Sequence, residues 1–339
     1  MRSRILLVAI AAASAACAGT APAPTAQRAP PTHAAAGSPF ESRAGASPSS
    51  DAPLTFSLVA KRDQTDIPDL QVAGYISHGP DGNLYVPSAS EVLVLDASGQ
   101  VVRRWGSPGS EPGQLDFIRV PGDATSAIGE VAFGSDGSVY VVEAGNKRVQ
   151  RFSASGRPEL MWGALGTGNG QFKDPIGIAI NEDGDVFVVD DERDDIQVFT
   201  ADGGYVRTIG RHGSGPGELQ FTGNIRIGPD GSVVNADFGN HRVQAWDASG
   251  QVAWTLGSRG NAAGQFIEPQ DVAFGDDGIL FVVDDARVQA FDRDRNFIGS
   301  WPEEPSSDHL ASIAFNGATL WVLAPYANTL YEIRVAPRT

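Results

Sequence analysis

Apolar residues in this chain occur in short runs rich in β-branched and aromatic side chains, with tight turns between them. Such runs predict β-strands, because amphipathic helices would repeat apolar positions every three or four residues. An Asp-Gly or Asn-Gly pair recurs between the runs and suits a short hairpin, since glycine accepts a positive φ freely. The glycines of the six pairs are Gly82, Gly137, Gly184, Gly231, Gly278 and Gly317.

The turn pairs are regularly spaced. Three successive intervals between Gly137 and Gly278 are each 47 residues long, whereas the first interval is 55 and the last is 39. Strand repeats of roughly 40 to 50 residues are typical of propeller blades. We therefore predict an all-β protein, a six-bladed β-propeller of four-stranded antiparallel blades.

One repeat, residues 175–210, illustrates the predicted blade. Two turn signals divide its apolar runs, and the runs predict four successive strands. The expected strands are 176–180, 185–189, 195–199 and 205–209.

The two ends of the repeat region complement each other. The last repeat offers three predicted strands, 311–315, 319–323 and 329–335, while the alternating segment 54–60 precedes the first full repeat. Pairing 54–60 as the outer strand of the sixth blade would close the ring and leave fewer exposed sheet edges.

Glycine-rich segments connect successive repeats, at 163–172, 210–219 and 257–266. Because no helix and no Lys-Ser/Thr pair follows them, we interpret them as tight crossovers and not as phosphate-binding loops. The repeats resemble NHL repeats, through Gly170-Gln171-Phe172 with Pro175 and Gly177, and through segments 146–149 and 240–244. This resemblance covers about residues 67–335. It implies a closed propeller, commonly of six blades, that serves as a binding platform more often than as an enzyme.

The first 17 residues have the pattern of a signal peptide. Arg2 and Arg4 precede an apolar core, and small residues lead to Cys17. The segment resembles a bacterial lipoprotein signal, which implies a lipid on Cys17 and an extracytoplasmic site on the cell envelope. An aspartate directly after the cysteine would resemble an inner-membrane retention signal, but this position is Ala18. An outer-membrane destination is therefore allowed. An ordinary signal peptide with an incidental cysteine is the alternative.

Residues 18–53 are rich in Ala, Pro, Ser and Gly and contain few large apolar side chains. We expect them to form a disordered tether that leads to a propeller domain at 54–339. Cys17 is the only cysteine, so an intramolecular disulfide is excluded.

The formal net charge of −16 limits the classes of partner. Nucleic acid and anionic lipid both require clustered Lys and Arg, so we expect membrane contact only through a lipid on Cys17. A protein, peptide or glycan ligand, or a cation, fits this charge better.

Alignment of the repeats on their turns places one residue just before each predicted inner strand. We expect these residues at the mouth of the central channel, on the face where the chain crosses between blades. They are Tyr75, Glu130, Gly177, Asn224, Asp271 and Ser312. Glu130, Asn224 and Asp271 form an oxygen set of the kind that Ca²⁺ accepts.

The same three residues resemble the metal ligands of the gluconolactonase and senescence-marker-protein family, in which six-bladed propellers hold a channel metal with Glu, Asn and Asp. This resemblance implies a metal site at Glu130, Asn224 and Asp271. Arg226 offers an alternative, because it stands where other blades have alanine and could bridge Glu130 or Asp271 structurally.

Other chemistry has weaker support. Zinc held by three histidines, as in the amidating-lyase propellers, which also resemble NHL domains, would need convergent rings with open coordination. We interpret His241 as a blade-surface residue and His78 as a core residue. Acids recur at the end of the second strand in four blades, which predicts a loop-holding role; they are Glu143, Asp190, Asp237 and Asp284. No Ser-His-Asp order is identifiable, and the domain has no thiol.

Blade two contains the one large insertion, residues 116–126, in the crossover on the face that we assign to Glu130. Long loops on rigid scaffolds often bind partners. We expect Phe117 and Arg119 to contact a partner, and a merely tolerated surface insertion is the alternative.

Two functions follow from these patterns. The first is a membrane-tethered binding or scaffolding module for a protein, peptide or glycan outside the cytoplasm. The alternative is a divalent-metal-dependent hydrolase or lyase at Glu130, Asn224 and Asp271, with the ion as Lewis acid.

Overall fold

The computed structural model describes residues 54–67, 70, 73–120, 127–275, 277–302 and 308–337. The predicted signal segment, Cys17 and the predicted tether lie outside these residues. No helix within the described ranges is both long and apolar enough to cross a membrane.

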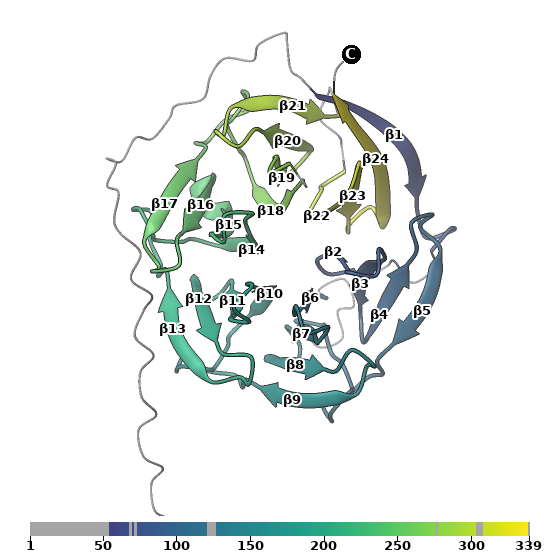
Figure 1. Ribbon diagram of the computed structural model, residues 1–339, viewed down its shortest axis with the longest axis vertical. Coiled ribbons are helices and arrows are strands. Elements are labelled where there is room, and N and C mark those ends of the chain that lie inside the picture. Colours follow the sequence, from purple (N-terminus) through teal and green to yellow (C-terminus); the bar gives the residue numbers. More distant parts are fainter. Residues whose placement is uncertain are drawn as a thin grey trace, which may run out of the picture. The chain divides into compact units, whose positions relative to one another are not determined.

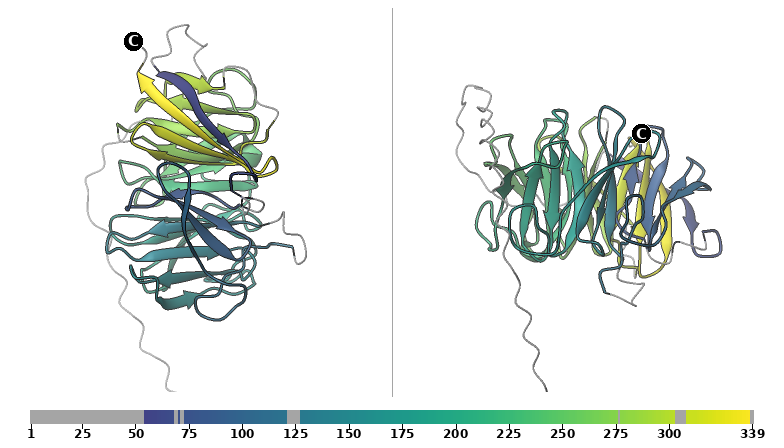
Figure 2. Two further views of the ribbon diagram at one scale, coloured as in Figure 1. Left: turned by 90° about the vertical axis from the view of Figure 1, so that its right-hand side faces the viewer. Right: turned by 90° about the horizontal axis from the view of Figure 1, so that it is seen from below.

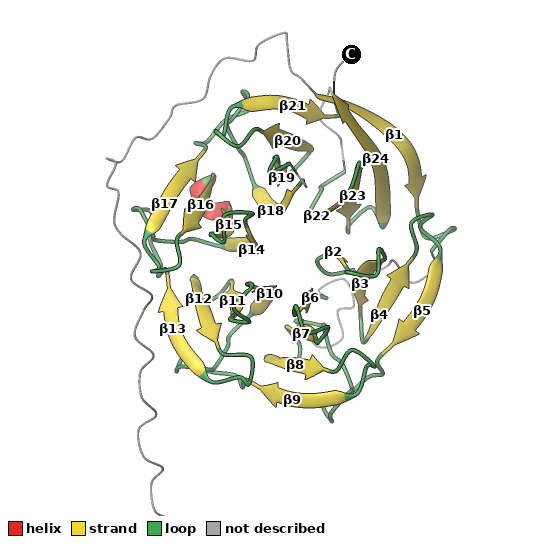
Figure 3. Ribbon diagram, in the orientation of Figure 1, coloured by secondary structure: helices red, strands yellow, loops and turns green. Residues whose placement is uncertain are grey.

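Six four-stranded antiparallel sheets surround a central axis, as predicted (Figure 1). Blades one to three consist of β2 Ser77–His78, β3 Leu84–Ser88, β4 Glu91–Leu95 and β5 Val101–Trp105; β6 Gly129–Phe133, β7 Val139–Glu143, β8 Arg148–Phe152 and β9 Pro158–Trp162; and β10 Pro175–Ile180, β11 Val186–Asp190, β12 Asp195–Phe199 and β13 Tyr205–Ile209. Blades four to six consist of β14 Thr222–Ile227, β15 Val233–Asp237, β16 Arg242–Trp246 and β17 Val252–Leu256; β18 Pro269–Phe274, β19 Leu280–Asp284, β20 Arg287–Phe291 and β21 Phe297–Trp301; and β22 Ser312–Asn316, β23 Thr319–Ala324, β24 Thr329–Pro337 and β1 Leu54–Arg62. Loops connect the strands, and the 3-10 helix η3, Phe238–Asn240, follows β15 (Figure 3).

The strands of the template blade match the prediction to within one residue. Their bounds are 175–180, 186–190, 195–199 and 205–209. The predicted closure is also confirmed, because β1 pairs antiparallel with β24, with Phe56 opposite Val335. Figure 1 shows this first strand beside the last one, so the two ends of the repeat region share one sheet.

Apolar side chains fill the spaces between neighbouring blades. Phe199 of blade three packs with Trp162 of blade two, their ring centroids 5.8 Å apart, and Phe172 of the crossover completes this group. Fully burying one such side chain stabilises the fold by roughly 1.5–3 kcal/mol. Each of four crossovers has one fully buried apolar residue that anchors it to the core. These residues are Leu115, Phe172, Leu219 and Phe266.

One glycine in each of four crossovers has a conformational role. Gly170 adopts φ +75°, which favours glycine, and its N–H donates to Gln197 Oε1 at 2.8 Å. The amide of Gln197 in turn donates to Gln171 O at 2.7 Å. Equivalent glutamine contacts recur at three other crossovers; the glycines are Gly113, Gly217 and Gly264.

The strands run between two faces of the ring (Figure 2). We call the face with the blade-to-blade crossovers and the loops between second and third strands the crossover face. The opposite hairpin face carries the Asp-Gly turns between first and second strands and the turns between third and fourth strands.

Candidate functional site

The acids that end the second strands hold the crossovers, as predicted. Asp190 accepts hydrogen bonds from the backbone N–H groups of Lys173 and Asp174 at 2.7 and 2.9 Å. Burial raises the pKa of Asp190 to about 6, although these hydrogen bonds favour the ionised form. Glu143, Asp237 and Asp284 accept equivalent backbone N–H groups.

The inner strands bring the predicted channel residues together. Asn224 Nδ2 donates to Glu130 Oε1 at 3.1 Å, and Ser312 Oγ donates to Asp271 Oδ2 at 2.9 Å. All four side chains are at most 1% exposed, and Tyr75 is also buried. They therefore form a buried polar cluster, and the expected open mouth at these positions is corrected to a closed channel end.

Arg226 bridges the two carboxylates of this cluster. Its Nη1 donates to Glu130 Oε1 at 2.5 Å, and its Nη2 donates to Asp271 Oδ2 at 3.1 Å. These contacts are those of the structural bridge that the sequence offered as an alternative to a metal. Arg226 thereby joins blades two, four and five across the channel, and Ser312 adds blade six to the cluster.

Each carboxylate oxygen in the cluster also accepts a hydrogen bond from a neighbour other than Arg226. The donors to Glu130 include Ser77 Oγ and the Ile178 N–H, and the donors to Asp271 include the Val272 and Ile313 N–H groups. Asn224 Oδ1 accepts from the Ile225 N–H at 2.8 Å. The oxygens that a cation would need are therefore already engaged with N–H and O–H donors.

These residues do not fit a Ca²⁺ ion. A guanidinium lies between the two carboxylates, and Asn224 presents its NH₂ group, not its oxygen, to Glu130. Within the described residues, no group of three or more His, Cys, Asp or Glu side chains is placed to hold a metal. The histidines are instead dispersed: His212 contacts Asp194, and His241 contacts the Ile267 carbonyl.

Burial dominates the electrostatics of the cluster. It raises the pKa of Glu130 to about 7, with Arg226 opposing this rise and Asp271 adding to it. Burial also raises the pKa of Asp271, again opposed by Arg226, and raises the pKa of the Tyr75 phenol. The cluster therefore binds a proton more tightly than exposed carboxylates would.

Gly177 is the one glycine among the six residues aligned before the inner strands, and it leaves room for the side chain of Asn224. A Cβ atom there would lie 2.0 Å from Asn224 Oδ1. The glycine in blade three therefore lets the side chain of Asn224 reach Glu130, a role that the turn alignment does not reveal.

The rest of the channel is a cavity of about 490 Å³. Glu130 and Arg226 lie at its closed end, and exposure increases along the inner strands toward the hairpin face. Small and large apolar side chains form most of its walls, and Ser77 and His78 of blade one also line it, so His78 lies at the channel and is only partly buried. The apolar residues are Ala132, Ala179, Ala273, Ala314, Phe133, Ile180, Ile227, Phe274 and Phe315. This cavity was not predicted from the sequence, although it has a signal there: a large apolar residue stands three positions after Glu130 and at the equivalent position of four other blades.

The insertion of blade two is positioned differently from the prediction. Phe117 is fully buried in the core between blades one and two, and its N–H donates to Ala89 O at 2.9 Å. Arg119 forms ion pairs with Asp174 and, at 3.3 Å, with Asp191. The expectation that Phe117 contacts a partner is therefore corrected: its ring anchors the insertion. Arg119 is engaged within the chain, although it keeps 31% of its side-chain surface exposed.

Comparison with known proteins identifies the architecture. A family model described as a 6-bladed beta-propeller matches residues 175–255. No curated protein matches the chain in sequence.

Solved structures give the same result over most of the chain. A catalytically inactive virginiamycin B lyase from Staphylococcus aureus, solved with quinupristin, has a TM-score of 0.58 at 13% identity, covering 83% of this chain and 99% of that one. A gluconolactonase from Xanthomonas campestris has a TM-score of 0.55 at 14% identity, covering 78% and 86%. A protein of unknown function from Bacteroides thetaiotaomicron has a TM-score of 0.58 at 15% identity, covering 84% and 76%. At these identities the likeness shows a shared six-bladed propeller fold.

Proposed function

We propose that this protein is an extracytoplasmic, membrane-tethered binding module that takes part of a protein, peptide or glycan ligand into its central channel. The observation that carries the proposal is the 490 Å³ cavity, closed by the Arg226 cluster and lined by apolar side chains toward the hairpin face. Its volume lies within the range of about 300–1,000 Å³ that is usual for ligand pockets.

The closed end of the cavity favours a hydrogen-bond acceptor on the ligand. Arg226 uses its two terminal nitrogens to donate to Glu130, Asp271 and the carbonyls of Ile76 and Ile225. Among the described contacts its Nε–H has no acceptor, and 19% of the side chain is exposed. A neutral carbonyl or hydroxyl on an apolar body fits this end better than an anion, because two carboxylates already flank the guanidinium.

The metal-dependent hydrolase or lyase is the weaker candidate. The structures that resemble this chain include a lyase and a gluconolactonase, but here the ligand set expected for an ion is bound to Arg226. We therefore place the function in recognition and not in metal-assisted hydrolysis.

The tether in this proposal rests on the lipoprotein-like segment that ends at Cys17. Incorporation of radiolabelled palmitate should be lost in Cys17→Ser, and the protein should leave the membrane fraction. Equal labelling of Cys17→Ser and wild type would contradict a lipid on this residue.

Binding in the cavity can be measured with Nile red, a neutral apolar dye with a carbonyl acceptor that fluoresces more strongly in apolar surroundings. We expect saturable binding to the wild-type chain. Ala179→Phe, which fills the cavity, should weaken binding at least tenfold. Phe315→Ser provides a second variant at a partly buried wall position, where Phe315 stacks on Phe281; provided that it melts cooperatively, it should also weaken binding.

The matched control is Ala248→Phe, which adds the same ring to an exposed turn on the hairpin face. It should bind Nile red as wild type does. Absence of saturable binding, or equal affinity in wild type and both cavity variants, would overturn the proposal.

A further inference from the structure

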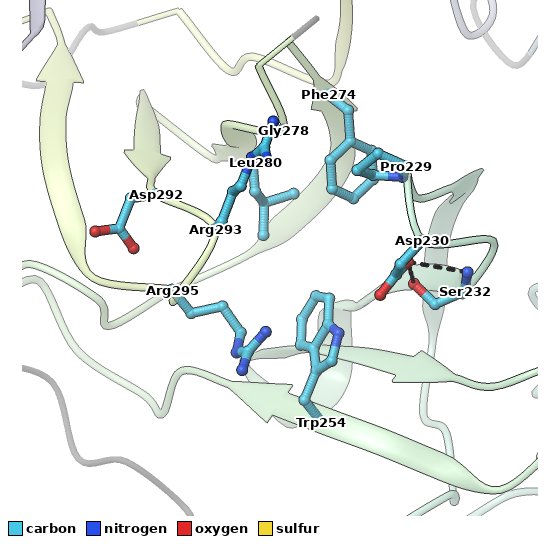
Figure 4. Close-up of a pocket in the computed structure, with 10 residues that line it drawn as sticks. All are labelled: Pro229, Asp230, Ser232, Trp254, Phe274, Gly278, Leu280, Asp292, Arg293 and Arg295. Carbon is cyan, nitrogen blue, oxygen red and sulfur yellow. Dashed lines mark hydrogen bonds between the residues drawn. The ribbon is translucent and has the colours of Figure 1, made fainter. Parts of the chain in front are cut away.

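A second cavity, of about 370 Å³, lies on the hairpin face between blades four and five. Trp254 of β17 and Leu280 of β19 form its sides, and turns 228–232 and 292–296 border it (Figure 4). Phe274 lines both this groove and the central cavity. No residue of the groove except Phe274 belongs to the channel site described above.

Arg295 occupies an unusual position in the turn beside the groove. It adopts φ +67°, in the left-handed region, and its N–H donates to Asp292 O at 2.9 Å. The equivalent residue in each of the four other turns between third and fourth strands is a glycine, with φ between +75° and +83°; the four are Gly99, Gly156, Gly203 and Gly250. A side chain at such a position strains the backbone, and retained strain is often associated with a functional site.

The strained position puts a guanidinium on an aromatic wall of the groove. The Arg295 guanidinium lies over the Trp254 ring, 5.1 Å from its centroid. At the preceding junction the residue equivalent to Trp254 is Arg207, which donates to Ala248 O at 3.2 Å and so ties β13 to the neighbouring turn. At the groove the arginine is Arg295, which comes from the turn and not from the strand. Among the described contacts it stacks on Trp254 and makes no side-chain hydrogen bond.

The other charges around the groove are mostly engaged locally. Arg293 Nε donates to Asp277 O at 2.5 Å, and Asp292 accepts from the Asp294 and Asn296 N–H groups. Within the described contacts, the exposed guanidinium of Arg295 has no hydrogen-bond acceptor. Figure 4 shows Arg295 and Asp230 at opposite ends of the groove, with Trp254 between them.

We propose that this groove binds a monocarboxylate with an apolar body. The planar guanidinium of Arg295 would bind the carboxylate through two parallel N–H donors, and the apolar body would lie on Phe274 and Leu280. Asp230 and the net charge of −16 disfavour ligands with more than one negative charge. This site is distinct from the channel cavity and shares only Phe274 with it.

The test is a ¹⁹F NMR titration of the full chain with 4-fluorophenylacetate and its neutral analogue 4-fluorophenylacetamide. We expect the acid to bind at least tenfold more tightly than the amide. Arg295→Gly restores the glycine of the four equivalent turns, so it should fold, and it should lose binding of the acid at least tenfold. Arg157→Gly removes the same charge from another turn of the hairpin face and should keep wild-type affinity for the acid.

Testing each variant against the other ligand separates this site from the channel. Ala179→Phe should leave binding of the acid unchanged, and Arg295→Gly should leave Nile red binding unchanged. Equal affinities for acid and amide, unchanged binding in Arg295→Gly, or loss of the acid in Ala179→Phe would overturn the groove proposal whatever the outcome for the central cavity.

Discussion

Arg226 Nη1 donates to Glu130 Oε1 at 2.5 Å, although the two residues are 96 positions apart in the chain. This contact crosses the channel from blade four to blade two, and the second terminal nitrogen of Arg226 reaches Asp271 of blade five. The propeller therefore has an ionic lock at one end of its channel and an apolar cavity at the other. Single substitutions can separate the structural role of the lock from the binding role of the cavity.

Replacement of Arg226 should strongly destabilise the fold. Arg226→Met would leave Glu130 and Asp271 buried without their cation, which typically costs about 3–5 kcal/mol. The measurement is the free energy of unfolding in urea. Arg157→Met breaks an exposed pair with Glu159 and should cost less than about 1 kcal/mol. Equal effects of the two substitutions would contradict a structural role for the lock.

The pKa of Glu130 predicts a pH dependence of stability. Its folded pKa, about 7, lies above the ordinary value of 4.5, so the folded state binds the proton more tightly than the unfolded state. The resulting contribution to stability is fully present below pH 4.5 and is lost as pH rises through 7. A difference of one pH unit between the folded and unfolded pKa values corresponds to about 1.4 kcal/mol of stability.

Glu130→Gln should remove this contribution. Between pH 5 and pH 8, the wild-type free energy of unfolding should fall more steeply than that of the variant, and their difference should change by roughly 1–3 kcal/mol. Parallel pH profiles of the two proteins would show that Glu130 titrates normally.

Two phenylalanines, Phe117 and Phe221, can test whether Phe117 anchors the insertion in the core. Phe117 is fully buried, whereas Phe221 is 58% exposed. Phe117→Ala should cost about 3–5 kcal/mol of unfolding free energy because it opens a cavity in the core, and Phe221→Ala should cost less than about 0.5 kcal/mol. A small effect of Phe117→Ala, combined with loss of a bound partner, would restore the original expectation.

The strain at Arg295 predicts that its replacement by glycine is tolerated. Arg295→Gly loses a stack on Trp254 worth about 0.5–1 kcal/mol, and it gains relief of about 1–2 kcal/mol from the left-handed conformation. The two effects should leave the melting temperature within a few degrees of wild type. A loss above about 2 kcal/mol would show that the stack serves stability and not binding.

The sequence predicts most of the fold because each blade repeats its own local signals. The Asp-Gly turns fix the strand order, and the unpaired segment at 54–60 identifies the closure. The loop-holding role of Asp190 and its equivalents could also be predicted, since one acid recurs at one position of the repeat. Arg226 could be recognised because four other blades have alanine at its position.

The candidate site was predicted in part. Alignment of the repeats on their turns identified which residues meet in the channel. It does not predict how exposed these side chains are, because neighbouring loops decide which end of the channel solvent reaches. The direction of the Asn224 amide depends on a backbone N–H at Ile225 that no spacing reveals. The burial of Phe117 depends on its packing against blade one, and insertion length alone does not indicate it.

The assignment of the Glu130–Asp271 cluster to Arg226, and not to a metal, can be tested most directly by thermal unfolding of the full chain in EDTA and in excess Ca²⁺, with Asp271→Asn alongside. A specific ion present at about 100 times its dissociation constant would stabilise the fold by about 3 kcal/mol. We predict the same melting temperature for the wild type in both conditions, and a lower one for Asp271→Asn that is equally insensitive to calcium. A calcium-dependent rise in the wild type that Asp271→Asn loses would place a metal where we place Arg226.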